Sequence, residues 1–279
     1  MKILRRSEEN SGFSLVEIAV VLVIISVLIT IVAVPLATQL EQQRTVETNK
    51  QLETIKEAII GFALARGRLP CASLLVDKGN EVVNETTGVC GAYSGFLPAV
   101  TLGISPIDSD GFAVDAWGLA QNRIRYAVMD ITTNPATTPV FAECPATAVA
   151  HVLTKRDGMK SVSMSCLSKY SETTLPTPPP PRTLITVCPQ TPAASAPYCA
   201  GSMLTNTAPF VVISLGKNAA TGGVGTDETY NAGTAGGGLV FVSHTRAVAG
   251  AAGGEFDDLV TWTSLNTLFA RMVQAGRLP

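Results

Sequence analysis

The sequence predicts an α+β protein in which a long N-terminal transmembrane α-helix packs on a C-terminal, β-rich, antiparallel globular head. Three observations support this fold class. No residue from Ile18 to Leu40 is charged, and helical spacing of apolar residues continues to about Arg66. After Pro70 the chain changes to short segments of strand character, separated by loops rich in glycine and proline.

The apolar run comes first and is long enough to cross a bilayer. It exceeds the ~18 to 20 apolar residues that a membrane-spanning helix needs. A secretory signal peptide has a shorter apolar core followed by a small-residue cleavage site, and no Ala-x-Ala site follows this run. Lys2, Arg5 and Arg6 precede it, which favours a cytoplasmic N-terminus and places the bulk of the chain outside the cytoplasm.

The predicted helix continues beyond this run as an amphipathic segment. Apolar residues recur at helical spacing, with charged residues on the other face: Leu52, Ile55, Ile59, Phe62 and Ala63 against Glu53, Lys56 and Glu57. Gly67-Arg-Leu-Pro70 supplies a glycine stop followed by proline. A helix from Phe13 to this stop would be roughly 80 Å long, and Pro35 predicts a kink within it.

The head is expected to contain several short strands and one terminal helix. The strand predictions cover 122–129, 183–188, 210–215, 239–243 and 255–262. Ser264 is a candidate N-cap for a final helix, which ends at a second Gly-Arg-Leu-Pro string. The proline-rich segment 176–182 predicts a stiff, exposed loop, and the glycine-rich segment 222–238 predicts a mobile loop that contributes nothing to the core.

All six cysteines follow the apolar run, so a membrane anchor would place them on one side of the membrane. Their number is even and no C-x-x-C pair occurs, which favours disulfides in an oxidising periplasm over a zinc site. Nearest neighbours in the chain suggest the pairs Cys71–Cys90, Cys144–Cys166 and Cys188–Cys199. Each pair would stabilise the head by ~2 to 4 kcal/mol.

Composition and motifs give little sign of catalysis or nucleic-acid binding. The formal net charge is -2, and the two histidines, His151 and His244, are isolated in the sequence. We therefore expect no enzyme and no nucleic-acid partner. Carboxylates in loops are candidate calcium ligands, namely Asp108, Asp110, Asp115, Asp227 and Glu228, although the twelve-residue loop spacing is not met. The alternative is that they cap turns and contact solvent.

Gly12-Phe-Ser-Leu-Val-Glu17, with its basic leader and the apolar run after it, resembles the processing motif of type IV prepilins and type II secretion pseudopilins. The resemblance implies that prepilin peptidase cuts between Gly12 and Phe13, and that Phe13 is then N-methylated. It also implies that Glu17 pairs with the N-terminal amine of a neighbouring subunit. Such a pairing would make a buried carboxylate tolerable and fix the register of assembly. Alternatively, Glu17 lies in the lipid headgroup region.

This resemblance implies a pilin-like organisation of the chain. Residues 1–12 would be the leader, 13–40 the transmembrane and filament-core half of the helix, 41–66 the half that packs on the head, and 67–279 the head. Asp115-Ala-Trp117-Gly118 is similar to a segment of major pseudopilins, which hold calcium in a late loop. Here Asp227, Glu228 and Asn231, or instead Asp257 and Asp258, would take that part. No other cofactor is implied.

The function expected from the resemblance is that of a structural pilin subunit, minor or specialised. Its partners would be other subunits of a helical filament, the prepilin peptidase, and the bacterial inner membrane before assembly. The finished filament would be a pilus on the cell surface. One alternative is a pseudopilin of type II secretion, which acts in the periplasm. Another is a single-pass membrane-anchored adhesin or binding protein, which would not be cut at Gly12.

Overall fold

A computed structural model of the chain describes residues 14–129, 151–161, 163–165, 185–192, 199, 203–223, 225–233, 240–251 and 253–278, without the side chains of residues 30–37. Several predictions lie outside these residues. They are the leader with Gly12 and Phe13, the proline-rich loop 176–182, and the Cys144–Cys166 pair. The chain divides into two compact units, residues 1–46 and 47–279.

The N-terminal unit is built from the first part of helix α1, Leu15–Arg66. Its apolar side chains are largely exposed, with Leu15 at 86% and Ile29 at 62%. The helix continues without interruption through the position of Pro35, and the predicted kink stays a prediction. Among the residues that the structure describes, no helix combines the length and the apolar character needed to cross a membrane.

The second part of α1 belongs to the C-terminal unit and packs as its apolar spacing predicts. Leu52, Ile55 and Ile59 are buried in the core, whereas Glu53 and Glu57 are exposed. The helix ends at the predicted stop, where Gly67 has a φ of 68°. Glycine is needed there also for space, since a Cβ would lie 2.6 Å from Oδ1 of Asp157.

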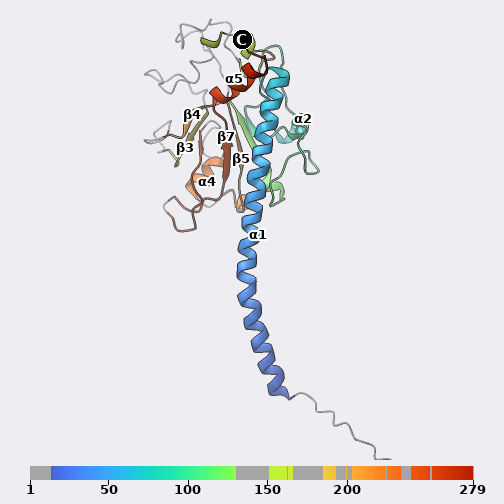
Figure 1. The fold of residues 1–279 in the computed structure, drawn as a ribbon, viewed down its shortest axis with the longest axis vertical. Helices are drawn as coiled ribbons and strands as arrows, with labels where there is room; N and C mark the ends of the chain where they lie inside the picture. The colour runs from blue at the N-terminus through green and yellow to red at the C-terminus, as the bar shows by residue number, and fades with distance from the viewer. Residues whose placement is uncertain are drawn as a thin grey trace, which may run out of the picture. The chain divides into compact units, whose positions relative to one another are not determined.

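One sheet of four strands confirms the antiparallel prediction. Its order is β1-β2-β5-β7, comprising β1 (Ser94–Phe96), β2 (Arg125–Val128), β5 (Phe210–Ser214) and β7 (Leu259–Trp262), and every neighbouring pair is antiparallel. All five residues of β5 are buried. Figure 1 shows β5 and β7 beside the part of α1 that follows residue 47.

A second sheet departs from the antiparallel prediction. Its order is β4-β3-β6, with β4 at Thr205–Ala208, β3 at Ile185–Cys188 and β6 at Val240–Val242, and β3 pairs with β6 in parallel. A parallel pair needs a long connection between its strands. The chain between β3 and β6 provides one, because it contains β4, β5 and helix α4 (Thr226–Asn231).

Helix α4 also corrects the prediction that 222–238 is a loop without core contacts. Asn231, at its end, is 4% exposed, and its amide side chain bonds both backbone groups of Val242 in β6. Nδ2 donates to the Val242 carbonyl at 2.8 Å, and Oδ1 accepts the Val242 N–H at 2.7 Å. The helix is therefore held by polar contacts, which the glycine-rich composition did not reveal.

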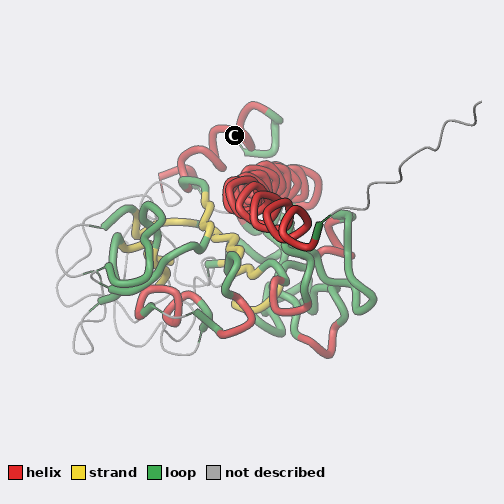
Figure 2. Tube along the Cα trace, turned by 90° about the horizontal axis from the view of Figure 1, so that it is seen from below, coloured by secondary structure: helices red, strands yellow, loops and turns green. Residues whose placement is uncertain are grey.

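The final helix, α5 (Leu265–Gln274), closes the hydrophobic core as predicted. The hydroxyl of Ser264 accepts the N–H of Thr267 at 3.1 Å, which confirms the N-cap. Leu268 and Met272 are fully buried in the same core as Leu52 of α1. Viewed along α1, α5 and the strands both lie near that helix (Figure 2). Other elements within the described residues are α2 (Ala99–Leu102) and 3-10 turns at Leu75–Asp77, Ala120–Asn122, Met159–Ser161 and Ala219–Thr221.

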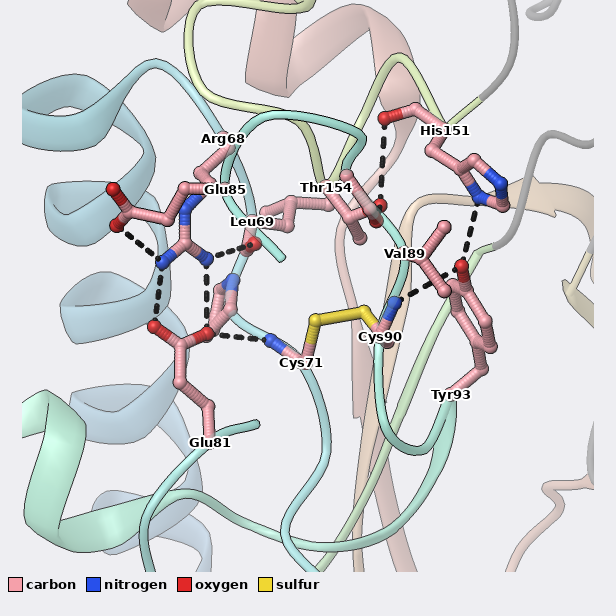
Figure 3. The surroundings of a disulfide bond; sticks show 12 residues. Arg68, Leu69, Cys71, Glu81, Glu85, Val89, Cys90, Tyr93, His151 and Thr154 are labelled. Atoms are coloured by element: carbon pink, nitrogen blue, oxygen red, sulfur yellow. Dashed lines mark hydrogen bonds and ion pairs between the residues drawn. A yellow bond between two sulfur atoms is a disulfide. The ribbon is translucent and has the colours of Figure 1, made fainter. Parts of the chain in front are cut away.

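Two of the predicted disulfides are present in the structure, Cys71–Cys90 and Cys188–Cys199. The first lies beside a buried ion pair (Figure 3). Arg68 is 2% exposed, and its two terminal nitrogens contact the carboxylate of Glu81 at 2.9 and 2.6 Å. The same carboxylate accepts the N–H of Cys71 at 2.9 Å. The loop after α1 is thus fixed by a covalent bond and by a bidentate ion pair.

Candidate functional site

The first candidate site is the start of α1, next to the predicted cleavage point. Ser14 Oγ accepts the N–H of Glu17 at 3.2 Å, so Ser14 caps the helix. Ser-x-x-Glu is the sequence pattern of a capping box, so residues 14–17 carry a helix-start signal in the sequence itself, one that the predicted start at Phe13 does not use. Glu17 lies in the first turn, where the helix dipole favours a negative charge.

The neighbours of Glu17 on the helix are apolar and exposed. Val16 is 71% exposed and Ile18 is 49% exposed. Any surface that covered these side chains would also remove water from the Glu17 carboxylate, which would then need a cationic partner. In the structure Ser14 caps the backbone N–H of Glu17, while the exposed carboxylate of Glu17 is accessible to a partner.

The early calcium candidates make structural contacts instead of forming an open site. Arg123 contacts Asp108 at 2.6 Å and Asp110 at 2.5 Å. Burial alone would raise the pKa of Asp108, but the N–H groups of Phe112 and Asp110, together with Arg123, lower it. These two carboxylates therefore neutralise an arginine.

Asp115 lies in a separate, buried network that joins its turn to β5. Its Oδ2 accepts the hydroxyl of Ser214 at 2.6 Å and the amide of Asn122 at 3.1 Å, while Oδ1 accepts the N–H of Trp117 at 2.9 Å. Burial raises the pKa of Asp115. Both oxygens of Asp115 already accept hydrogen bonds, so this aspartate stabilises the Asp-x-Trp-Gly turn.

The late acidic residues form the second candidate site. Glu228 of α4 and Asp257 and Asp258, just before β7, each offer an oxygen, and these atoms lie within 4.8 Å of one another. We call these three residues the acidic cluster. Their exposures are 1%, 7% and 6%. The fold thus unites residues that the sequence offered as two separate alternatives.

Asp227, the remaining candidate, is directed elsewhere. Its Oδ1 accepts the N–H of Thr191 at 2.7 Å, and its Oδ2 lies 3.1 Å from Nε2 of His244. Asn231 does join the acidic cluster, where its Nδ2 donates to Oδ2 of Asp258 at 2.8 Å.

Hydrogen bonds satisfy only part of the acidic cluster. Glu228 accepts the N–H of Asp257 at 2.7 Å, and Asp257 Oδ2 accepts the N–H of Lys217 at 3.1 Å. Among the described residues, however, Oδ1 of Asp257 and Oδ1 of Asp258 are buried and have no hydrogen-bond donor. Buried polar atoms of this kind call for an explanation, such as a bound ion.

The electrostatics of the acidic cluster favour positive charge. Burial, and then the nearby charge of Glu228, raise the pKa of Asp257 to about 6. Burial raises the pKa of Asp258 as well, against the hydrogen bond from Asn231. A set of buried oxygen ligands suits a hard cation such as Ca²⁺. Either a proton or such an ion would relieve the repulsion between these carboxylates.

Comparison with known proteins identifies the first candidate site. Residues 9–33 match the family model of the prokaryotic N-terminal methylation motif, which is the prepilin-type cleavage and methylation signal. This match covers Gly12, Phe13, Ser14 and Glu17 but only a small part of the chain. No curated protein and no solved structure matches the chain.

Proposed function

We propose that the chain is the precursor of a filament subunit, a minor or specialised pilin that is cut after Gly12 and built into a type IV pilus or a related filament. The observation that carries this proposal is the methylation motif at residues 9–33, placed directly at the start of an exposed apolar helix. Such a motif supports a structural subunit of the pilin or pseudopilin type.

The exposed apolar surface of the first part of α1 would be covered in one way before assembly and in another way after it. Val20, Leu22 and Leu28 are 53%, 61% and 57% exposed. A helix that is apolar on all sides needs to be covered. Lipid would cover it in the inner membrane, and helices of neighbouring subunits would cover it in the filament. The head would then remain in contact with water.

Within the filament, Glu17 would pair with the amine of Phe13 from a neighbouring subunit. Removal of the leader creates this amine, so processing would produce the partner that the carboxylate needs. A buried pair is tolerated where a single buried charge is strongly disfavoured. The pairing would therefore select one register of assembly.

The cleavage step is tested by Gly12→Ala, with Ser11→Ala as the matched control in the leader. We expect Gly12→Ala to retain the full leader by intact mass, and Ser11→Ala to be processed as usual. If Gly12→Ala were cut to the parent mass, the proposed site would be wrong.

The pairing step is tested by Glu17→Gln, which keeps the shape of the side chain but removes its charge. Ser14→Ala is the control, since it weakens the helix cap by about 1 kcal/mol and leaves the carboxylate in place. We expect intact mass to show that both variants are processed. Sheared filaments should contain the Ser14→Ala protein and lack the Glu17→Gln protein. If the Glu17→Gln protein entered filaments at the level of the parent, the proposed pairing of Glu17 with the Phe13 amine would be wrong.

The acidic cluster supports a second proposal, which is that the head binds Ca²⁺ through Glu228, Asp257 and Asp258. The observation that favours it is the pair of buried aspartate oxygens without a hydrogen-bond donor among the described residues. An ion held there would join α4 to the segment before β7 and so stabilise the head. Its role would be structural, because it would neutralise buried carboxylates.

A further inference from the structure

Two arginines near the start of β2 make the same aromatic contact but differ in their counter-charges. Cζ of Arg123 lies 4.5 Å from the ring centroid of Phe112, and Cζ of Arg125 lies 4.7 Å from that of Phe96. Arg123 is also paired with Asp108 and Asp110. For Arg125 the described part of the chain provides no ion pair.

Arg125 is a partly buried cation on which no described carboxylate acts. It lies in β2, opposite Phe96 of β1 and Ile213 of β5, and so has a strand on each side. Its Nε is buried and has no hydrogen-bond acceptor among the described residues. Burial alone lowers the pKa of Arg125, with no carboxylate acting against it. The buried Nε of Arg125 thus lacks an acceptor, while the residue as a whole is only partly buried, so a counter-charge from outside this part of the chain can reach it.

A small pocket beside Arg125 offers a place for that counter-charge. Its lining comes from the first sheet, from the end of α4 and from β6, and includes Ser94, Gly95, Arg125, Tyr230, Gly233 and Phe241. None of the described residues that line it is acidic. The arginine is therefore the one charged group in the described lining, and it lies among hydroxyl and aromatic neighbours.

We propose that this pocket binds a carboxylate group. The planar guanidinium fork matches the two oxygens of a carboxylate, and the pocket is small, which suits one such group better than a large, multiply charged anion. The hydroxyls of Ser94 and Tyr230 are further donors in the lining. Asn231 lines this pocket and also donates to Asp258, but the proposed ligand contact uses Arg125 and none of the three carboxylates of the acidic cluster, so its test is separate from those of the cluster and of the cleavage motif.

The first test uses full-length protein in detergent micelles and ¹³C-labelled acetate at constant ionic strength. Line broadening of the acetate signal should saturate with the parent protein and disappear with Arg125→Gln. Arg123→Gln is the matched control, and it should retain the broadening although it loses two ion pairs. Broadening that is equal in all three proteins, or that never saturates, would overturn the proposal.

The second test compares unfolding temperatures without any added carboxylate. Arg125→Met should unfold no lower than the parent, because it replaces an unpaired cation with an apolar side chain of similar length. Arg123→Met should unfold several degrees lower, because it leaves two carboxylates without their partner. If both variants fell equally, Arg125 would have an internal partner and the proposal would be wrong.

A third arm identifies the source of the carboxylate. The blocked peptide acetyl-Gly-Asp-Gly-amide is compared with acetate, and its Asn counterpart serves as the control. Stronger binding of the Asp peptide than of acetate would assign the pocket to an acidic side chain of a protein partner. Stronger binding of acetate would assign it to a free small carboxylate, and binding of neither would overturn the proposal.

Discussion

If the acidic cluster binds Ca²⁺ as proposed, the stability of the protein should depend on both pH and Ca²⁺. The pKa of Asp257 is raised from 3.8 to about 6 in the folded protein. The folded state therefore binds more protons than the unfolded state between these two values. It follows that the contribution of Asp257 to the free energy of unfolding is greatest below about pH 4 and is lost as the pH rises through 6. The shift of about two pKa units corresponds to at most about 3 kcal/mol.

The assay is urea unfolding of the full-length protein in micelles, followed by tryptophan fluorescence at pH 4.5 and pH 7.5. With a chelator present, the parent should lose stability between these two conditions relative to Asp257→Asn. The difference between the two proteins isolates the acidic cluster from Asp108, whose lowered pKa acts in the opposite direction. Added Ca²⁺ should restore the parent at pH 7.5 and have less effect at pH 4.5, where protons compete.

One result would contradict the expected repulsion between the carboxylates, and another would contradict the binding of Ca²⁺. If Asp257→Asn were less stable than the parent at pH 7.5 in chelator, the carboxylates would not repel one another as their burial implies. If the pH effect appeared but Ca²⁺ gave no rescue, the acidic cluster would bind protons and not the ion. Asp110→Asn, which removes a carboxylate outside the cluster, should keep both the pH effect and the rescue.

Three further changes test the packing of the head and of α1. Glu81→Gln should lower the free energy of unfolding by roughly 2 to 3 kcal/mol in the same assay, because it removes the charge of the bidentate partner of the buried Arg68 guanidinium and leaves only Glu85, 3.3 Å away; a loss below about 1 kcal/mol would contradict the burial of this pair. Leu268→Ala should cost about 2 to 5 kcal/mol, since this side chain is fully buried in the core. Leu22→Ala should leave unfolding of the head unchanged, because its side chain is exposed, and a clear loss of stability would contradict that placement.

Periodicity and end signals made the helices predictable from the sequence. The second part of α1 and all of α5 have apolar residues at helical spacing, and both end at a glycine with positive φ, Gly67 and Gly276. These signals are local, so they hold without knowledge of the fold. The short strands β1 and β4 have no such signal. Their sequences, Ser-Gly-Phe and Thr-Asn-Thr-Ala, are strands because neighbouring strands pair with them.

The candidate sites also differ in whether their residues are adjacent in the sequence or are brought together by the fold. The cleavage motif is a contiguous string, so the sequence alone located Gly12, Phe13 and Glu17. The acidic cluster could be predicted only as separate candidates, because Glu228 and Asp257 are 29 positions apart and meet through the packing of α4. The surroundings of Arg125 are set by the strands on either side of it, which place Phe96 and Ile213 opposite this residue. No sequence pattern indicates that pairing.

One measurement tests both the proposed processing of the N-terminus and the proposed assembly into a filament. Cells that express the protein are sheared, and the shed filaments and the membranes are each analysed by intact mass. We expect the shed fraction to contain protein that begins at N-methylated Phe13 and lacks residues 1–12. Processed protein confined to the membranes would favour the pseudopilin alternative. Unprocessed protein found in the membranes alone would contradict the account.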